Sequence, residues 1–156
     1  MSEDARFSEL IGLPNETDVL EVAVRLAANL AGEEGRAIYF GIEGELGIVL
    51  AEHDPKGMAA PSFVWLADHR ALRQVVQTGQ PQQTEFTEAE VSGSAAKGVE
   101  RLGLSSGAAA PVFVKGRLHG VLAVGGRGAQ INAFARLVDL ARAVEAGLGQ
   151  VHEGTA

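Results

Sequence analysis

The sequence predicts an α+β fold with a mostly antiparallel sheet of about six strands. Two pairs of strand-like segments are each joined by a short turn that contains glycine, which is typical of β-hairpins. Segments with the apolar spacing of amphipathic helices precede, separate and follow these hairpins. The order is helix, two strands, strand, helix, strand, helix, two strands, helix. Such a mixture favours an antiparallel sheet over a parallel one.

The first helix is expected to begin near residues 15–18 and to end at Gly32 and Gly35. Asp18 and Glu21 form a capping-box pattern at its start. The apolar residues that follow recur every three or four positions and therefore lie on one helix face: Val19, Val22, Ala23, Leu26, Ala27 and Leu30.

Both hairpins are rich in residues that favour strands. The first joins residues 36–42 to residues 45–53, and the second joins 108–114 to 117–124 through the turn Lys115-Gly116. Apolar residues occupy both faces of the first hairpin, so we expect both faces of the sheet to be covered.

Shorter elements lie between the hairpins. Residues 62–66 and 82–86 are strand candidates, and Asp68 is expected to cap a helix that ends at the turn after Val76. A weak helix interrupted by glycine is expected from Thr87, which has Glu90 three residues later, to Leu102. A long helix should follow from Ile131 to Val151, with a frayed tail at 152–156.

Composition excludes several classes of function. The 156 residues carry a net charge of −7 and show no basic stripe, so nucleic-acid binding is not expected. Cysteine is absent, which excludes disulfides, thiolate metal sites and thiol nucleophiles. We find no signal peptide and no apolar run long enough to span a membrane, and we therefore expect a cytoplasmic protein.

Two segments of the sequence resemble the GAF domain family. Residues 103–124 match the pattern of the family's final hairpin, in which an apolar strand containing Pro111 turns at Gly116 and returns through Gly120. Residues 72–81 resemble its helix followed by a Thr-Gly-x-Pro turn. The resemblance covers about residues 5–151 and predicts a single domain over 1–156, with PAS-like sensors as the related alternative.

The resemblance implies a small-molecule-sensing module. The terminal helices would cover one face of a six-stranded antiparallel sheet, and a ligand pocket would lie on the other. The segment around residues 62–80 would border that pocket. Candidate pocket residues are therefore Trp65, His69 and Arg73, together with Tyr39 and His119 because each is a polar aromatic residue in an apolar strand.

Each candidate also has a simpler structural explanation. Trp65 can fill a core, His69 and Arg73 can occupy an exposed helix face, and His119 can be a hydrogen-bonded strand histidine. The family's bilin-attachment cysteine and the cysteines of its free-methionine sulfoxide reductase branch have no counterpart here.

The sequence motifs that could indicate catalysis or metal binding are weak. Gly103-x-Ser105-x-Gly107 matches a hydrolase nucleophile elbow, but the expected order of helix then strand is the reverse of what an elbow requires. The four histidines are not spaced as metal ligands in helices or hairpins. We therefore expect no catalytic residues, no metal and no cofactor.

The last helix is apolar over a wide arc, which favours a role as an interface between two copies of the chain. We therefore expect a non-enzymatic, homodimeric signalling module that binds a small molecule, a signalling protein or both. A ligand-free dimerisation scaffold with a filled pocket is the alternative, and a small enzyme that uses Ser105 is a third hypothesis. The candidate interface residues are Ile131, Phe134, Val138, Ala141, Val144 and Leu148.

Overall fold

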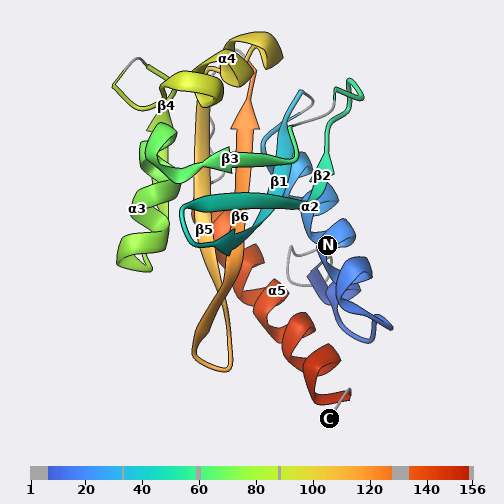
Figure 1. Ribbon diagram of the computed structural model, residues 1–156. Coiled ribbons are helices and arrows are strands. Elements are labelled where there is room, and N and C mark those ends of the chain that lie inside the picture. Colours follow the sequence, from blue (N-terminus) through green and yellow to red (C-terminus); the bar gives the residue numbers. More distant parts are fainter. Residues whose placement is uncertain (1–6, 33, 59–60, 88, 128–133, 155–156) are drawn as a thin grey trace.

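The computed structural model describes residues 7–32, 34–58, 61–87, 89–127 and 134–154, and it has the predicted α+β architecture (Figure 1). One antiparallel sheet has the strand order β3-β2-β1-β6-β5-β4. Its strands are β1 (Arg36–Glu43), β2 (Leu46–His53), β3 (Phe63–Trp65), β4 (Gln82–Glu85), β5 (Ser106–Val114) and β6 (Arg117–Gly126). The helices are η1 (Ser8–Leu10), α2 (Glu16–Leu30), η2 (Leu66–Asp68), α3 (Arg70–Thr78), α4 (Gly93–Leu102) and α5 (Phe134–Gly154).

The helices α2 and α5 pack side by side on one face of the sheet, as expected for the terminal helices. Their apolar stripes and the strand residues beneath them form the main core. Fully buried members of this core include Val19, Ala23, Ala27, Tyr39, Val112, Leu122, Leu137, Leu140, Val144 and Leu148.

No helix in the described part of the chain is long and apolar enough to cross a membrane.

The opposite face of the sheet is covered by α3, α4 and their connections. A second and smaller core lies here, and it contains Phe40, Leu72, Val75, Ala109 and Val121. The two cores confirm that both sheet faces are covered, because β1, β5 and β6 contribute apolar side chains to each.

The β5–β6 hairpin turns at Lys115 and Gly116, both of which have positive φ angles, of 54° and 77°. The structure thus confirms the predicted two-residue turn, and it has the type I′ geometry whose twist matches that of the strands. Val114 consequently pairs with Arg117.

The capping residues of two helices differ from the prediction, although α2 begins within the predicted residues 15–18. The N-cap of α2 is Asn15, whose side chain accepts a hydrogen bond from the Asp18 amide at 2.9 Å, so Asp18 lies inside the helix. The N-cap of α3 is His69, one residue beyond the predicted Asp68, and its Nδ1 accepts from the Leu72 amide at 3.3 Å. In both cases the side chain that reaches the free amides of the first turn sets the start.

The helix α4 is shorter than predicted. Residues 89 and 90 form a turn instead, and the Thr87 carbonyl accepts a hydrogen bond from the Glu90 amide at 3.0 Å. The Glu90 carbonyl then accepts from the Arg70 amide at 2.9 Å, which ties this segment to the start of α3 and keeps it out of the helix. The last helix, by contrast, continues through Gly154, so residues 152–154 are helical rather than frayed.

A bulge in β6 changes the direction of one predicted site residue. Val112 pairs with Gly120, and the next residue of β5, Phe113, pairs with Leu118, so His119 is the extra residue. A bulge interrupts the alternation of side chains between the two faces of a sheet. His119 therefore points toward the α2–α5 face instead of sharing the face of Val121, as strict alternation predicted.

Gly147 lets η1 approach α5 closely. A Cβ placed on Gly147 would lie 2.5 Å from the carbonyl oxygen of Leu10, whereas a Cβ on Gly149 would meet nothing within 4 Å. Both glycines lie in α5, so they form a natural pair for comparing steric with helix-propensity effects.

We expect Gly147→Ala to lower the free energy of unfolding by about 1–3 kcal/mol, because η1 must shift away from α5. Gly149→Ala should raise it by about 0.5–1 kcal/mol, because alanine favours the helix. Urea denaturation followed by circular dichroism measures both changes. Equal effects of the two substitutions would contradict the close contact with Leu10.

Candidate ligand-binding cavity

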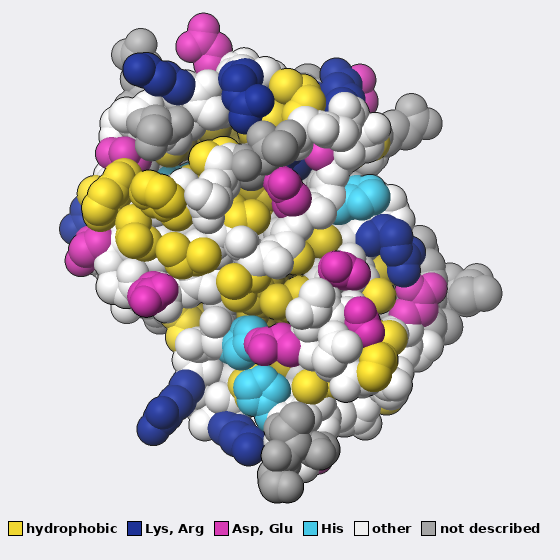
Figure 2. All heavy atoms as spheres, turned by 45° about the vertical axis from the view of Figure 1, so that its right-hand side comes forward, with side chains coloured by type: hydrophobic (Ala, Val, Ile, Leu, Met, Phe, Trp, Pro, Cys, Tyr) yellow, Lys and Arg dark blue, Asp and Glu magenta, His cyan; other side chains and the backbone are white. Residues whose placement is uncertain are grey.

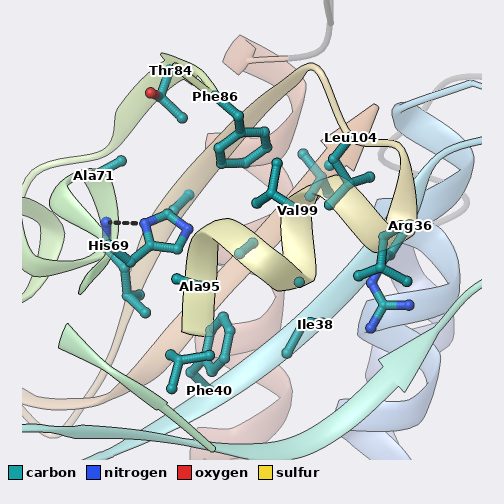
Figure 3. Close-up of a pocket in the computed structure, with 18 of the residues that line it drawn as sticks. Arg36, Ile38, Phe40, His69, Ala71, Thr84, Phe86, Ala95, Val99 and Leu104 are labelled. Carbon is teal, nitrogen blue, oxygen red and sulfur yellow. Dashed lines mark hydrogen bonds between the residues drawn. The ribbon is translucent and has the colours of Figure 1, made fainter. Parts of the chain in front are cut away.

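A cavity of about 100 Å³ lies between the sheet and the layer formed by α3 and α4. Its floor is made by strand residues, which include Ile38, Phe40 and Ala123. Figure 3 shows Phe86, Val99 and Leu104 on its opposite side. Nearly all of the lining is apolar, so the cavity suits a molecule that is itself mostly apolar.

His69 supplies a polar group to this lining. Its Nδ1 accepts the hydrogen bond that caps α3, so the neutral ring carries its proton on Nε2. Its ring also meets that of Phe86 edge to face, with the centroids 5.8 Å apart. Burial lowers the pKa of His69 below its ordinary value of 6.5, against the opposing effects of a backbone hydrogen bond and of Glu90. The side chain is therefore a neutral N–H donor at neutral pH.

Arg36 lines the cavity on the side opposite His69 (Figure 3). Only 2% of its side chain is exposed. Its terminal nitrogens bind Glu52 at 2.9 Å, Asp54 at 2.8 Å and the Met58 carbonyl at 2.7 Å. Its Nε–H, however, is buried and has no acceptor among the described residues. A buried donor without an acceptor is costly, so an acceptor atom of a ligand that reached this group would gain free energy.

Asp54 links Arg36 to a second arginine at the end of β6. Arg127 donates two hydrogen bonds to the Asp54 carboxylate, at 2.6 and 3.0 Å, and the side chains of Asp54 and Arg127 are 2% and 5% exposed. Burial by itself raises the pKa of Asp54. Hydrogen bonds from Arg127, the Lys56 amide and Arg36 outweigh burial and hold that pKa well below its ordinary value. Asp54 is therefore charged at neutral pH.

Arg127 also ties three segments together. Its Nε donates to the Leu102 carbonyl at the end of α4 at 2.8 Å, and one terminal nitrogen donates to the Glu34 carbonyl at 3.0 Å. Arg36, Asp54 and Arg127 form a buried network, here called the Arg127 network. This network connects α4, the helix over the cavity, to the segment between α2 and β1.

Known structures share this architecture at low sequence identity. The free methionine-R-sulfoxide reductase from Neisseria meningitidis, solved with its substrate, has a TM-score of 0.76 and 13% identity over 97% of this chain and 88% of its own. The phycocyanobilin-bound GAF domain of a cyanobacterial phytochrome has a TM-score of 0.73 and 13% identity over 99% of this chain and 97% of its own. The chain has a GAF-like fold.

The photosensory core module of the Stigmatella aurantiaca phytochrome matches with a TM-score of 0.68 and 15% identity over 96% of this chain. The GAF-like chain spans only 35% of that module's length. No family model matches the sequence, and no curated protein matches it. The likeness therefore lies in the fold, in agreement with the resemblance seen in the final hairpin.

Among the predicted pocket residues of this GAF-like domain, His69 lines the cavity. Tyr39 and His119 lie on the other face of the sheet, where the Tyr39 hydroxyl and His119 Nδ1 are 2.5 Å apart. Trp65 is 49% exposed on the edge strand β3, where its ring packs edge to face on that of Phe63. Arg73 is exposed on α3. None of these four residues lines the cavity.

Sequence reasoning did not single out Arg36 or Phe86 as lining residues. A signal for Arg36 existed, because an arginine at the start of a strand with apolar residues on both faces needs buried partners. No local sequence pattern connects Asp54 with Arg127. Their pairing joins residues 73 positions apart, which local patterns do not reveal.

The predicted interface stripe lies largely inside the domain. Ala141, Val144 and Leu148 are fully buried against α2 and the sheet, whereas Phe134 and Val138 are partly exposed. Ile131 is outside the described residues. Pairing of two copies stays a prediction, and the buried part of the stripe is already occupied within one chain.

We expect Asp54→Asn to lower the free energy of unfolding by about 3 kcal/mol, since it leaves two buried arginines without their shared anion. Because folding lowers the pKa of Asp54, its contribution is complete above the ordinary carboxyl pKa of 3.8 and is lost as the pH falls below it. Urea titrations of both proteins across this range measure the difference.

A suitable control for the Asp54 variant is Glu9→Gln, which breaks an exposed ion pair with Arg25. This change should cost less than about 1 kcal/mol. A cost for Asp54→Asn no larger than that of the control would contradict the stabilising role of the buried network.

The His69 ring should titrate below 6.5, as followed by its NMR shifts. Folding lowers this pKa, so His69 contributes stability fully above 6.5 and loses that contribution as the pH falls toward the folded-state pKa. His69→Asn keeps a capping side chain and should remove this part of the pH dependence. A ring that titrates above 6.5 would show that it is not buried as a neutral donor.

Proposed function

We propose that this GAF-like domain is a non-enzymatic sensor module that binds a small and mostly apolar molecule in the cavity between the sheet and α4. The observation that carries the proposal is the cavity's chemistry, in which apolar walls lie between the neutral imidazole of His69 and Arg36, whose buried Nε–H has no acceptor among the described residues. A few placed polar groups in an apolar pocket are typical of small-molecule sites. The sensor domains among the similar structures support the same class of role.

The volume of the cavity limits the size of the ligand. About 100 Å³ is below the range of roughly 300–1,000 Å³ for drug-sized ligands and near that of an engineered cavity that holds benzene. We therefore favour a compact ring or short-chain compound that carries an acceptor oxygen. A bilin exceeds this volume, and the chain has no cysteine to attach one.

The cavity carries donors but no activated nucleophile. Among the described lining residues, Thr84 is the sole hydroxyl, and it donates its proton to the Glu85 carbonyl at 3.1 Å. Ser105 lies outside the lining, in the loop that leads from α4 into β5, so it is not presented by a strand-to-helix elbow. These features support binding rather than catalysis.

Signal transmission would run through the Arg127 network. A ligand that moves the end of α4 displaces the Leu102 carbonyl, which Arg127 holds together with Asp54 and the Glu34 carbonyl. Glu34 follows α2, so the change reaches a terminal helix. We include in the proposal that two copies pair through the terminal helices, using partly exposed residues such as Phe134 and Val138.

The alternative is a scaffold that pairs without a ligand. The small volume of the cavity favours it, because only a modest expansion of the side chains would fill the space. The two functions differ in one measurable respect, since only the sensor gains stability from a small molecule.

Native mass spectrometry of the purified chain, followed by thermal unfolding with a panel of small aromatic and short-chain acids and amides, tests the proposal. A ligand at one hundred times its Kd should raise the Tm by roughly 5–10 °C. Val99→Phe should fill the cavity and weaken binding by at least about tenfold. Lys97→Ala, on the exposed side of α4, is the matched control and should bind normally.

Failure of every compound to shift the Tm, with a dimer at bare mass, would favour the scaffold. Equal binding by Val99→Phe and wild type would place any ligand elsewhere.

A further inference from the structure

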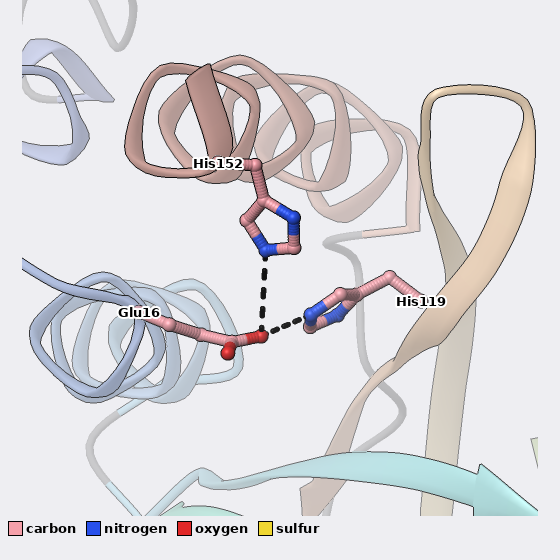
Figure 4. A group of neighbouring side chains, drawn as sticks. All are labelled: Glu16, His119 and His152. Atoms are coloured by element: carbon pink, nitrogen blue, oxygen red, sulfur yellow. Dashed lines mark hydrogen bonds and ion pairs between the residues drawn. The ribbon is translucent and has the colours of Figure 1, made fainter. Parts of the chain in front are cut away.

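A cluster of two histidines and a carboxylate forms on the face of the sheet opposite the cavity. Glu16 is the first residue of α2, His119 is the bulged residue of β6, and His152 lies in the last turn of α5 (Figure 4). One potential ligand atom from each residue lies within 4.8 Å of the others. This is the one such group of three found among the described residues.

The three donors converge on one place. The Glu16 carboxylate contacts His119 Nε2 directly and lies 4.0 Å from His152 Nε2. Figure 4 shows both rings turned toward the carboxylate from different elements. Metal–ligand bonds of about 2.0–2.1 Å in a tetrahedral site place the donors roughly 3.4 Å apart. Side-chain shifts of about an ångström would give that spacing, and Glu16 and His152 are exposed enough to make them.

Tyr39 supports the cluster from beneath. Its hydroxyl lies 2.5 Å from His119 Nδ1, the ring nitrogen that does not face Glu16. A histidine that binds a metal usually donates a hydrogen bond from its second ring N–H to an oxygen, and this hydrogen bond fixes the tautomer and the ring orientation. The fully buried Tyr39 ring holds that oxygen in a set position.

We propose that Glu16, His119 and His152 bind a divalent transition-metal ion, with Zn²⁺ as the best match. Two imidazole nitrogens and one carboxylate oxygen form a known ligand set for zinc and for its neighbours in the first transition row. Ca²⁺ and Mg²⁺ prefer oxygen ligands and fit this set poorly. The His152 and Glu16 side chains are 36% and 43% exposed, and Figure 2 shows two histidines beside an acidic side chain at the surface, so water can take a further coordination position. The site is independent of the cavity and does not require that a ligand bind there.

The bound ion would join both terminal helices to the sheet. It would hold the last turn of α5 against the first turn of α2 and against the β6 bulge. Segments that are far apart in the sequence would thus be cross-linked at one point. Ion binding should therefore slow hydrogen exchange in the last turn of α5.

Isothermal titration of the chelator-stripped full chain with Zn²⁺ tests the site. We expect one ion per chain with a Kd in the micromolar range or tighter. Co²⁺ should give the visible absorption of a nitrogen- and oxygen-ligated ion, and Mg²⁺ should give no binding. His152→Ala and Glu16→Gln should each weaken Zn²⁺ binding by more than about tenfold.

Two further variants make the test specific. His53→Ala removes a histidine outside the cluster and should bind Zn²⁺ as the wild type does. Tyr39→Phe removes only the supporting oxygen and should weaken binding by about tenfold or more while the far-UV circular dichroism stays unchanged. Tyr39 is a positioning residue, so a change in the metal affinity of the folded protein is its signature.

Absence of stoichiometric Zn²⁺ binding would overturn the proposal, and the cluster would then be a histidine held between a tyrosine and a carboxylate by hydrogen bonds. Binding that survives both His152→Ala and Glu16→Gln would also overturn it, because the ion would lie elsewhere. Both positions are partly exposed, so these variants stay informative even where His119→Ala fails to fold.

Discussion

The two-sided sheet is the constraint on which the rest of this structure depends. The strands β1, β5 and β6 carry apolar side chains on both faces, so each face must be shielded from water. The long helices α2 and α5 cover one face. The other face is covered by α3 and by α4, whose inward positions include the small residues Ala95 and Gly98. Small side chains fill little space, and the cavity is the volume that they leave.

Charge is buried where the cavity ends. Arg36, Asp54 and Arg127 form a chain of ion pairs that is almost fully shielded from solvent, and Glu52 adds a second carboxylate to Arg36. Burying these charges is costly unless each finds a partner, and here nearly every donor does. Among the described residues, the exception is the buried Nε–H of Arg36, a residue that also lines the cavity. The network therefore ties the end of α4 to the segment between α2 and β1.

The two histidines predicted for the pocket, His69 and His119, lie on opposite faces of the sheet. The bulge in β6 turns His119 toward α2 and α5, where its ring nitrogens contact the Tyr39 hydroxyl and the Glu16 carboxylate. His69 lies on the other face because it caps α3. The cavity and the histidine cluster are thus two separate places, and each is controlled by different helices.

The sequence by itself determined the order of the elements, the two-residue hairpin turn at Lys115-Gly116 and the GAF-like resemblance, because these depend on local spacing and turn chemistry. It also indicated that both faces of the sheet would be covered and that His69 belongs near the pocket segment. Tertiary structure decided which side chains meet. Arg36 with Asp54 and Arg127, and Glu16 with His119 and His152, come together only through strand register, one bulge and helix packing, and these long-range contacts leave no periodic signal in the chain.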